Sequence, residues 1–267
     1  MPTLLTQDKD FFPQNLKDKF FYLQEAGFDG FEIDGKALLQ NFDEVKAAIK
    51  ATGFPVLTAC GGYSGWIGEF DKEKRREGLK DITLILERLS QIGGKGIVVP
   101  AAWGMFSLRL PPMVPPRSAN DDEKVLLESL HLLNEVAAKN NVTVFLEPLN
   151  RYEDHMINTL EKGAYYINKG GFKNVLVTAD FYHMNIEESN IAASLKKWKE
   201  YIGHMHLADN HRYQPGSGHT DFKEGFTTLK EIAYNGAFAI ECRVIGYDPN
   251  AAYLDSLKYI RQIFEQL

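Results

Sequence analysis

The sequence predicts an α/β fold, a (β/α)8 TIM barrel that forms a single domain over residues 1–267. Short apolar runs alternate with stretches of helical period along the whole chain. Eight such units fit into 267 residues, an ordinary length for a barrel of this kind. The sequence contains no recognisable domain boundary, internal repeat or low-complexity tail. The alternation predicts a parallel sheet with right-handed crossovers.

Eight apolar runs are the predicted strands. A short run precedes seven clearer ones; in order they are Thr3–Thr6, Phe31–Ile33, Pro55–Cys60, Gly96–Val99, Val142–Glu147, Val175–Asp180, Gly203–Ala208 and Phe238–Cys242. Apolar residues spaced three and four apart predict the helices between them. This spacing is clearest in 79–89 and 126–137, and we expect further helices over 15–24 and 249–264.

An open, doubly wound parallel sheet is the main competing architecture. Its nucleotide-binding form carries a glycine-rich GxGxxG turn after the first strand, and this sequence has no such motif. One connection is unusual in composition, because RLPPMVPPRSAND, residues 109–121, holds four of the eleven prolines. It follows the fourth strand, so we expect it at the C-terminal face of the barrel, either as a lid or substrate wall or as a passive rigid loop.

The composition is that of a soluble globular protein, with 44% hydrophobic and 25% charged residues. A formal net charge of −6 argues against a broad nucleic-acid-binding surface, which needs clustered Lys and Arg. The only two cysteines, Cys60 and Cys242, argue against a disulfide framework or a structural zinc site. The first residues lack the features of a signal peptide, and no run of about 18 apolar residues exists. We therefore expect a cytoplasmic protein that does not span or bind a membrane.

Four successive predicted strands end in residues of the type that binds metals. They are Glu147, Asp180, His206 and Glu241. Barrel enzymes place their catalytic groups at these C-terminal strand ends, where the strands converge. Each residue alone could be a salt-bridged carboxylate or a core histidine. Three converging carboxylates, however, would repel one another strongly in a site of low dielectric constant. A divalent cation would remove that repulsion.

The donor set of three carboxylates and one imidazole favours a hard or borderline metal such as Mn²⁺, Co²⁺ or Mg²⁺, with Zn²⁺ as an alternative. Cys242 is excluded as a ligand, because strand alternation points it away from the side that Glu241 faces. His204 shares a strand face with His206 but lies one layer deeper, so we interpret it as a supporting or core residue.

Three further polar residues follow the strand ends in the connecting loops. They are Glu153, His183 and Arg212. Above a metal, such side chains could hold the hydroxyl groups of a polar substrate. The alternative is that they are ordinary surface residues.

These segments resemble a known family. AGFDGFEI, LEPLNRYE, ADFYHMNIEE, HMHLADNHRYQPGSG and AIECR are similar to the xylose-isomerase-like barrels, and most of all to the D-tagatose 3-epimerase and D-psicose 3-epimerase group. The resemblance covers nearly the whole chain, and the spacing of the polar residues fits from Glu147 to Glu241. The sequence departs from the family pattern in the poorly marked first strand and in the proline-rich loop. Because these regions shape the far end of the substrate pocket, the resemblance leaves the identity of the sugar open.

The resemblance implies a role for each matching residue. Glu147 and Glu241 would be the catalytic acid/base pair. One divalent ion, Mn²⁺ by preference, would be held by Glu147, Asp180, His206 and Glu241. Glu153, His183 and Arg212 would contact a small-molecule sugar. The implied reaction is C3 epimerisation of a free ketose through a metal-stabilised enediolate, in which one carboxylate removes a proton and the other returns one to the opposite face. We also expect a homodimer or a homotetramer.

Other functions on the same barrel remain open. A keto–enol isomerase similar to hydroxypyruvate isomerase, or a dehydratase of keto-sugars or polyols, would use the same metal and base. Endonuclease IV-type DNA repair would need more His and Glu ligands and a basic surface. A non-catalytic sugar-binding barrel would be expected to lack a ligand or a base, whereas all four candidates are present here.

Overall fold

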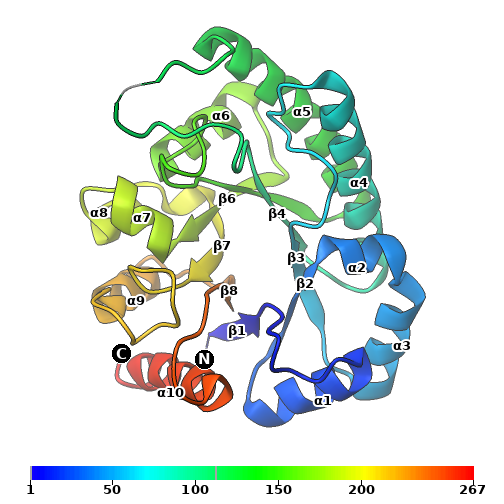
Figure 1. Cartoon of the computed structure of the whole chain (residues 1–267), viewed down its shortest axis with the longest axis vertical. Coiled ribbons are helices and arrows are strands. Elements are labelled where there is room, and N and C mark those ends of the chain that lie inside the picture. Colours follow the sequence, from blue (N-terminus) through cyan, green and yellow to red (C-terminus); the bar gives the residue numbers. More distant parts are fainter. Residues whose placement is uncertain (1, 112) are drawn as a thin grey trace.

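The fold is a closed barrel of eight parallel strands surrounded by helices (Figure 1). The computed structural model describes residues 2–111 and 113–267. The strands are β1 (Thr3–Thr6), β2 (Gly30–Asp34), β3 (Val56–Cys60), β4 (Gly96–Pro100), β5 (Thr143–Glu147), β6 (Val175–Asp180), β7 (Ile202–Leu207) and β8 (Ala237–Ile240). Each strand pairs with its neighbour in the sequence, and β1 closes the barrel on β8 through the pairs Thr3–Ala237 to Thr6–Ile240. The closed barrel is therefore confirmed, and the open sheet is excluded.

The helices lie outside the strands (Figure 1). They are α1 (Leu16–Ala26), α2 (Gly35–Gln40), α3 (Phe42–Thr52), α4 (Lys72–Gln91), α5 (Ala119–Asn140), α6 (Leu160–Gly170), α7 (Phe181–Glu187), α8 (Ile191–Lys197), the 3-10 turn η1 (Lys199–Tyr201), α9 (Phe222–Glu231) and α10 (Pro249–Glu265). Local signals set their ends. Asn15 caps α1 by accepting hydrogen bonds from the amides of Lys17 and Asp18, and Gly27 ends it in the left-handed conformation.

Two details differ from the sequence prediction. The strand predicted to continue to residue 242 ends at Ile240, so Glu241 is the first residue beyond β8. Its amide still donates to the carbonyl oxygen of Leu207, which holds it at the barrel rim. Two helices instead of one follow β2, and two follow β6. In the second pair, α7 begins directly at the strand end because Asp180 is itself the N-cap.

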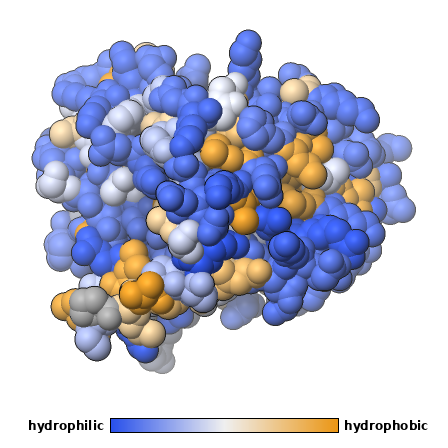
Figure 2. Space-filling view, turned by 90° about the horizontal axis from the view of Figure 1, so that it is seen from above, coloured by the Kyte–Doolittle hydropathy of each residue, from blue (hydrophilic) through white to orange (hydrophobic). Residues whose placement is uncertain are grey.

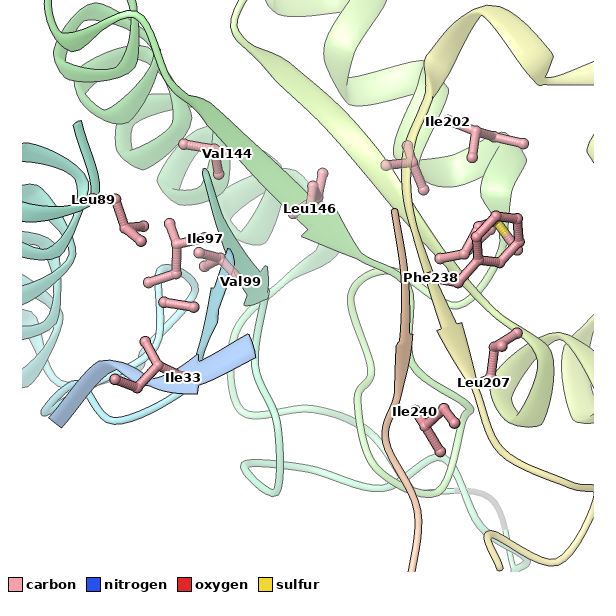
Figure 3. Close-up of a cluster of buried hydrophobic side chains, with 14 of the residues drawn as sticks. Ile33, Leu89, Ile97, Val99, Val144, Leu146, Ile202, Leu207, Phe238 and Ile240 are labelled. Atoms are coloured by element: carbon pink, nitrogen blue, oxygen red, sulfur yellow. The ribbon is translucent and has the colours of Figure 1, made fainter. Parts of the chain in front are cut away.

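Alternation along the strands separates an apolar outer layer from an interior that also holds polar side chains. Outward-facing strand residues pack against the helices, and Figure 3 shows Leu89 of α4 beside Ile97 of β4 in this layer. The alternate positions point into the barrel. There the chain places the buried polar residues Glu32, Thr58 and His204, with the apolar Phe145 stacked on His204. These three polar residues support the strand ends from beneath.

The proline-rich segment lies between β4 and α5, at the C-terminal face as predicted. The side chains of Leu110 and Val114 are 84% and 88% exposed. The distal end of the segment is anchored by Arg117, which donates to the carbonyl oxygens of Gly68 and Glu69 and pairs with Asp122.

The face of the molecule seen in Figure 2 is largely hydrophilic, with hydrophobic side chains gathered in a few patches. No helix in the described part of the chain combines the length and apolarity that crossing a bilayer requires.

The loop between β3 and α4 packs closely on α4 at two glycines, Gly65 of the loop and Gly78 of the helix. A Cβ on Gly78 would lie 1.9 Å from the carbonyl oxygen of Gly65, and a Cβ on Gly65 would lie 2.3 Å from that of Lys74. In an exposed helix, Gly→Ala normally stabilises by up to about 1 kcal/mol. Here we expect Gly78→Ala to destabilise the protein by about 1–3 kcal/mol, because a carbonyl group must move.

Chemical denaturation measures this effect. Lys80→Ala, at an exposed position of the same helix, is the control and should change the free energy of unfolding by less than about 0.5 kcal/mol. A stability of Gly78→Ala equal to or above that of the wild type would contradict the close contact.

Candidate active site and metal centre

Four side chains from four consecutive strands converge at the C-terminal rim of the barrel. Glu147 ends β5, Asp180 ends β6, His206 lies near the end of β7, and Glu241 follows β8. Their donor atoms all lie within 4.8 Å of one another. Nδ1 of His206 is 2.9 Å from Oε1 of Glu147, 3.1 Å from Oε2 of Glu241 and 3.9 Å from Oδ2 of Asp180. The four candidates named from the sequence therefore form one cluster.

The contacts in this cluster do not have hydrogen-bond geometry. Oε1 of Glu147, Oδ2 of Asp180 and Nδ1 of His206 are buried and make no hydrogen bond, although they lie close to one another. Donor atoms placed about 2.1 Å from a shared octahedral cation would be roughly 3 Å apart, as two of these pairs are. The buried, unpaired donors thus fit a divalent cation, and the cluster is a candidate metal site.

Burial and mutual charge shift the pKa values of the cluster in opposite directions. Burial raises the pKa of Glu147 to about 7, and it also raises the pKa of Asp180. Burial also works to raise the pKa of Glu241. The positive charges of His206 and Arg212 have the larger effect and hold the pKa of Glu241 well below its usual value. Burial works to lower the pKa of His206, but the surrounding carboxylates raise it well above normal. A cation would have to displace the protons that these groups retain.

Glu32 of β2 lies directly beneath this cluster, and the sequence reasoning missed it. Oε2 of Glu32 accepts hydrogen bonds from Thr58 Oγ1 at 2.7 Å and contacts His204 Nε2 at 2.8 Å. Oε1 accepts from Gln7 Nε2 at 3.0 Å and lies 2.9 Å from His206 Nε2. The sequence signal for Glu32 is an acidic residue between the apolar Phe31 and Ile33. The neighbour His204 supports Glu32, as expected of a residue one layer deeper.

Glu32, His204 and His206 form a second group with donor atoms close enough for a metal. However, both oxygens of Glu32 already accept hydrogen bonds from neighbouring side chains. In the cluster at the strand ends, both oxygens of Glu241 also accept hydrogen bonds, from Gln7 and Arg212. Oε1 of Glu147, Oδ2 of Asp180 and Nδ1 of His206 are unpaired there, so this cluster is the better metal site.

Arg212 joins the predicted substrate residues to the metal cluster. Its Nη1 lies 2.8 Å from Nε2 of His183 and 3.9 Å from Oε1 of Glu153, and its Nη2 lies 3.3 Å from Oε2 of Glu241. Although burial opposes it, the surrounding carboxylates raise the pKa of Arg212, so the side chain stays charged. The three residues predicted to contact substrate therefore lie together beside Glu241.

The predicted loop position of His183 is wrong. The residue lies in the first turn of α7 and is only 1% exposed, because Asp180 starts the helix immediately after β6. The backbone amide of Asn150 faces its Nδ1 at 3.0 Å, and Arg212 faces its Nε2. Burial and the charge of Arg212 lower the pKa of His183 well below its usual value, so the imidazole is neutral.

A buried carboxylate that the sequence reasoning also missed holds the loop that carries Arg212. Asp209 accepts hydrogen bonds from the amides of Gly216 at 2.9 Å, Gly218 at 2.8 Å and Thr220 at 3.0 Å. Arg212 itself has φ of 64°, a left-handed conformation that is uncommon for a residue with a side chain. Such strain persists only where the surroundings impose it, and here it directs the guanidinium group at Glu241.

A cavity of about 620 Å³ opens above the cluster. Its wall on the side of β5 to β8 is polar and includes Glu153, Arg212 and Glu241. Its wall on the side of β3 and β4 carries Trp66 and Trp103. The site therefore combines a metal-binding floor, a polar wall and an aromatic wall.

Comparison with known proteins identifies the family. A model of xylose isomerase-like TIM barrels matches residues 20–263. The chain belongs to this family. A 3-dehydro-D-guloside 4-epimerase from Escherichia coli is 57% identical over 96% of this chain and 98% of its own length. The crystal structure of a 3-keto-D-glucoside 4-epimerase from E. coli superposes with a TM-score of 0.96 at 55% identity, covering 98% of this chain and all of that one.

More distant members share the fold. An L-ribulose 3-epimerase from Mesorhizobium japonicum is 27% identical over 82% of this chain and 72% of its own length. The structure of a D-allulose 3-epimerase from Methylomonas sp. superposes with a TM-score of 0.84 at 20% identity, over 98% of this chain and 96% of that one. The xylose isomerase-like family and the enzyme class predicted from the sequence, a carbohydrate isomerase or epimerase, are thus confirmed.

The candidate metal site can be tested through Asp180. Asparagine can replace aspartate as the cap of α7, so Asp180→Asn should keep the fold while removing one charged ligand. We expect metal affinity, measured by competition with a chelator, to fall by about tenfold or more. The melting temperature of the metal-free protein should stay close to that of the wild type, because a like charge has been removed from the cluster.

Asp154→Asn is the matched control. Asp154 is equally buried, but its carboxylate accepts hydrogen bonds from the backbone amides of Ala102, Met156 and Ile157 and contacts none of the four clustered residues. Its metal affinity should stay at the wild-type value. Asp180 would be a structural residue if Asp180→Asn lowered the melting temperature but left the metal affinity unchanged.

Proposed function

We propose that this protein is a divalent-metal-dependent sugar epimerase that inverts a carbon next to a ketone, with Glu147 and Glu241 as the two acid/base groups. The observation that carries the proposal is the position of these carboxylates. Glu147 ends β5 and Glu241 follows β8, three strands further round the barrel, yet their carboxylates converge on one centre. Inversion needs a proton removed from one face and returned to the other, so it needs two such groups.

The substrate that we propose is a 3-keto-glycoside, inverted at C4. This proposal is supported by the E. coli relative at 57% identity, named a 3-dehydro-D-guloside 4-epimerase. The prediction from the sequence, C3 epimerisation of a free ketose, is the second candidate. It is favoured by several shorter matches, among them a D-psicose 3-epimerase from Ruminiclostridium cellulolyticum that is 36% identical over 43% of this chain. Both reactions invert the carbon adjacent to a ketone, so the same acid/base pair serves either.

The metal would be held by Glu147, Asp180, His206 and Glu241, and the unpaired buried donors of the first three support this assignment. Mn²⁺ is our first choice, with Co²⁺, Mg²⁺ or Zn²⁺ as alternatives, because oxygen donors predominate. When bound, such an ion lowers the energy of the negative charge that develops on the carbonyl oxygen as the proton leaves.

The remaining steps, which are proton transfer and binding of the sugar, would be carried out by side chains of this protein. His206 and the charged Arg212, which lies 3.3 Å from Glu241, keep that carboxylate ionised and able to accept a proton. Glu147, which comes from a different strand, would return a proton to the other face of the carbon. Glu153 at the cavity wall would hold hydroxyl groups of the sugar. His183 would contact the sugar only if a hydroxyl group replaced Arg212 at its Nε2, where Arg212 now lies at 2.8 Å.

Three further expectations stay predictions. They are the identity of the metal as manganese, the cytoplasmic location, and assembly into a homodimer or homotetramer. A keto–enol isomerase or a dehydratase would use the same groups and is distinguished by its product: an aldose or enol tautomer for the isomerase, a product lacking water for the dehydratase.

Solvent exchange tests the two-base reaction. In D₂O, the metal-loaded protein should convert methyl 3-keto-glucoside into its C4 epimer with one deuterium at the inverted carbon. Glu147→Gln and Glu241→Gln should each lower kcat by about 10²-fold or more, because inversion fails when either carboxylate is neutralised. NMR of the products measures both.

Glu231→Gln, an exposed carboxylate on α9, is the control and should leave kcat unchanged. Because both active-site changes also touch a metal ligand, metal content is measured on each variant. Turnover without exchange of a carbon-bound proton, in the glycoside and in a panel of ketoses, would exclude the proposed epimerisation.

A further inference from the structure

The cavity is larger than one sugar ring requires. Its volume of about 620 Å³ equals that of roughly 20 water molecules at liquid density. A single hexose bound at the metal cluster would displace only part of this volume. On the side of β3 and β4, the cavity is lined by Cys60, Gly61, Pro100, Trp66 and Trp103. None of these five residues carries a charge.

Trp66 and Trp103 form what we call the aromatic wall. Their ring centroids are 5.6 Å apart at an interplanar angle of 72°, and Tyr63 packs behind Trp66 at 5.3 Å and 80°. Trp103 is 50% exposed although it is one of the largest apolar side chains. Exposed apolar surface that is continuous with a polar site is typical of a place where a ligand binds.

The aromatic wall is held rigidly against the polar wall. Nε1 of Trp103 donates to Oε2 of Glu153 at 3.1 Å, and the amide of Gly104 donates to the carbonyl oxygen of Glu153 at 2.7 Å. Trp66 follows Gly65, whose close contact with Gly78 fixes that loop on α4. A ligand ring would therefore meet a preformed surface at little cost in ordering.

We propose that the aromatic wall is a subsite for the aglycone of a glycoside substrate, and that it prefers an aromatic aglycone. This rests on the proposed function, since a glycoside with its keto sugar at the metal cluster must direct its aglycone somewhere in the same cavity. The wall presents two large aromatic side chains to the same cavity as the metal cluster. Two indoles at a steep angle offer a face and an edge to a third ring, the arrangement that aromatic groups prefer.

Binding of unreactive ligands tests the subsite without turnover. Phenyl glucoside and methyl glucoside are titrated into the metal-loaded protein by calorimetry. We expect phenyl glucoside to bind about tenfold more tightly, equivalent to about 1.4 kcal/mol. In Trp66→Ala the preference should fall below about threefold, and in Trp66→Phe it should be intermediate. Trp66 is chosen because Trp103 also contacts Glu153.

Phe21→Ala is the control, because Phe21 is a 42% exposed aromatic residue on the outer helix α1. It should keep the full preference for the phenyl ligand. Equal affinity for both ligands in the wild type, or an unchanged preference in Trp66→Ala and Trp66→Phe, would overturn the subsite. Because the affinities of two ligands are compared on the same variant, a fraction of unfolded protein lowers both equally and does not change their ratio.

The same ligands in their 3-keto forms separate this inference from the proposed function. A phenyl preference in binding, together with no epimerisation of either keto-glycoside, would leave the subsite in place and exclude the proposed reaction. Epimerisation of both keto-glycosides at equal kcat/KM, with no phenyl preference in binding, would support the reaction and exclude the subsite.

Discussion

The mutual repulsion of Glu147, Asp180 and Glu241 is the constraint on which this site depends. Each pair of charges about 4 Å apart costs roughly 4 kcal/mol at an effective dielectric constant of 20. Positive charge reduces this repulsion, because His206 lies among the three carboxylates and Arg212 contacts Glu241. Retained protons reduce it further, as the raised pKa of Glu147 indicates. A bound divalent cation would take over the roles of this positive charge and of the retained protons.

The rest of the architecture keeps these charges in place. The barrel brings four strand ends to one point, and the polar interior beneath them carries Glu32, which contacts both His204 and His206. Above them, buried Asp209 and Asp154 tie the surrounding loops through backbone amides. Carboxylates thus serve both in the site and in its support. In the supporting Asp209 and Asp154, both oxygens accept hydrogen bonds from backbone amides, whereas Glu147 and Asp180 each keep one unpaired oxygen in the site.

The sequence predicted the barrel and the four-residue cluster because both follow from regular spacing. Strand periodicity places Glu147 and Asp180 at strand ends, and β7 places His206 and His204 on one face. Glu32 and Asp209 could not be found in this way, since their roles depend on partners such as Thr58 and Gly216 that lie far away in the sequence or in irregular loops. His183 was misplaced for a local reason: the capping Asp180 starts a helix directly after β6, where a loop was predicted.

The central claim is that the unpaired donors at the strand ends bind one cation. Anomalous X-ray diffraction from crystals soaked in Mn²⁺ tests it most directly, since the signal locates the ion without reference to activity. We predict a single strong peak in contact with Glu147, Asp180, His206 and Glu241. A peak among Glu32, His204 and His206, or no peak within the barrel while the four side chains keep their positions, would contradict the account.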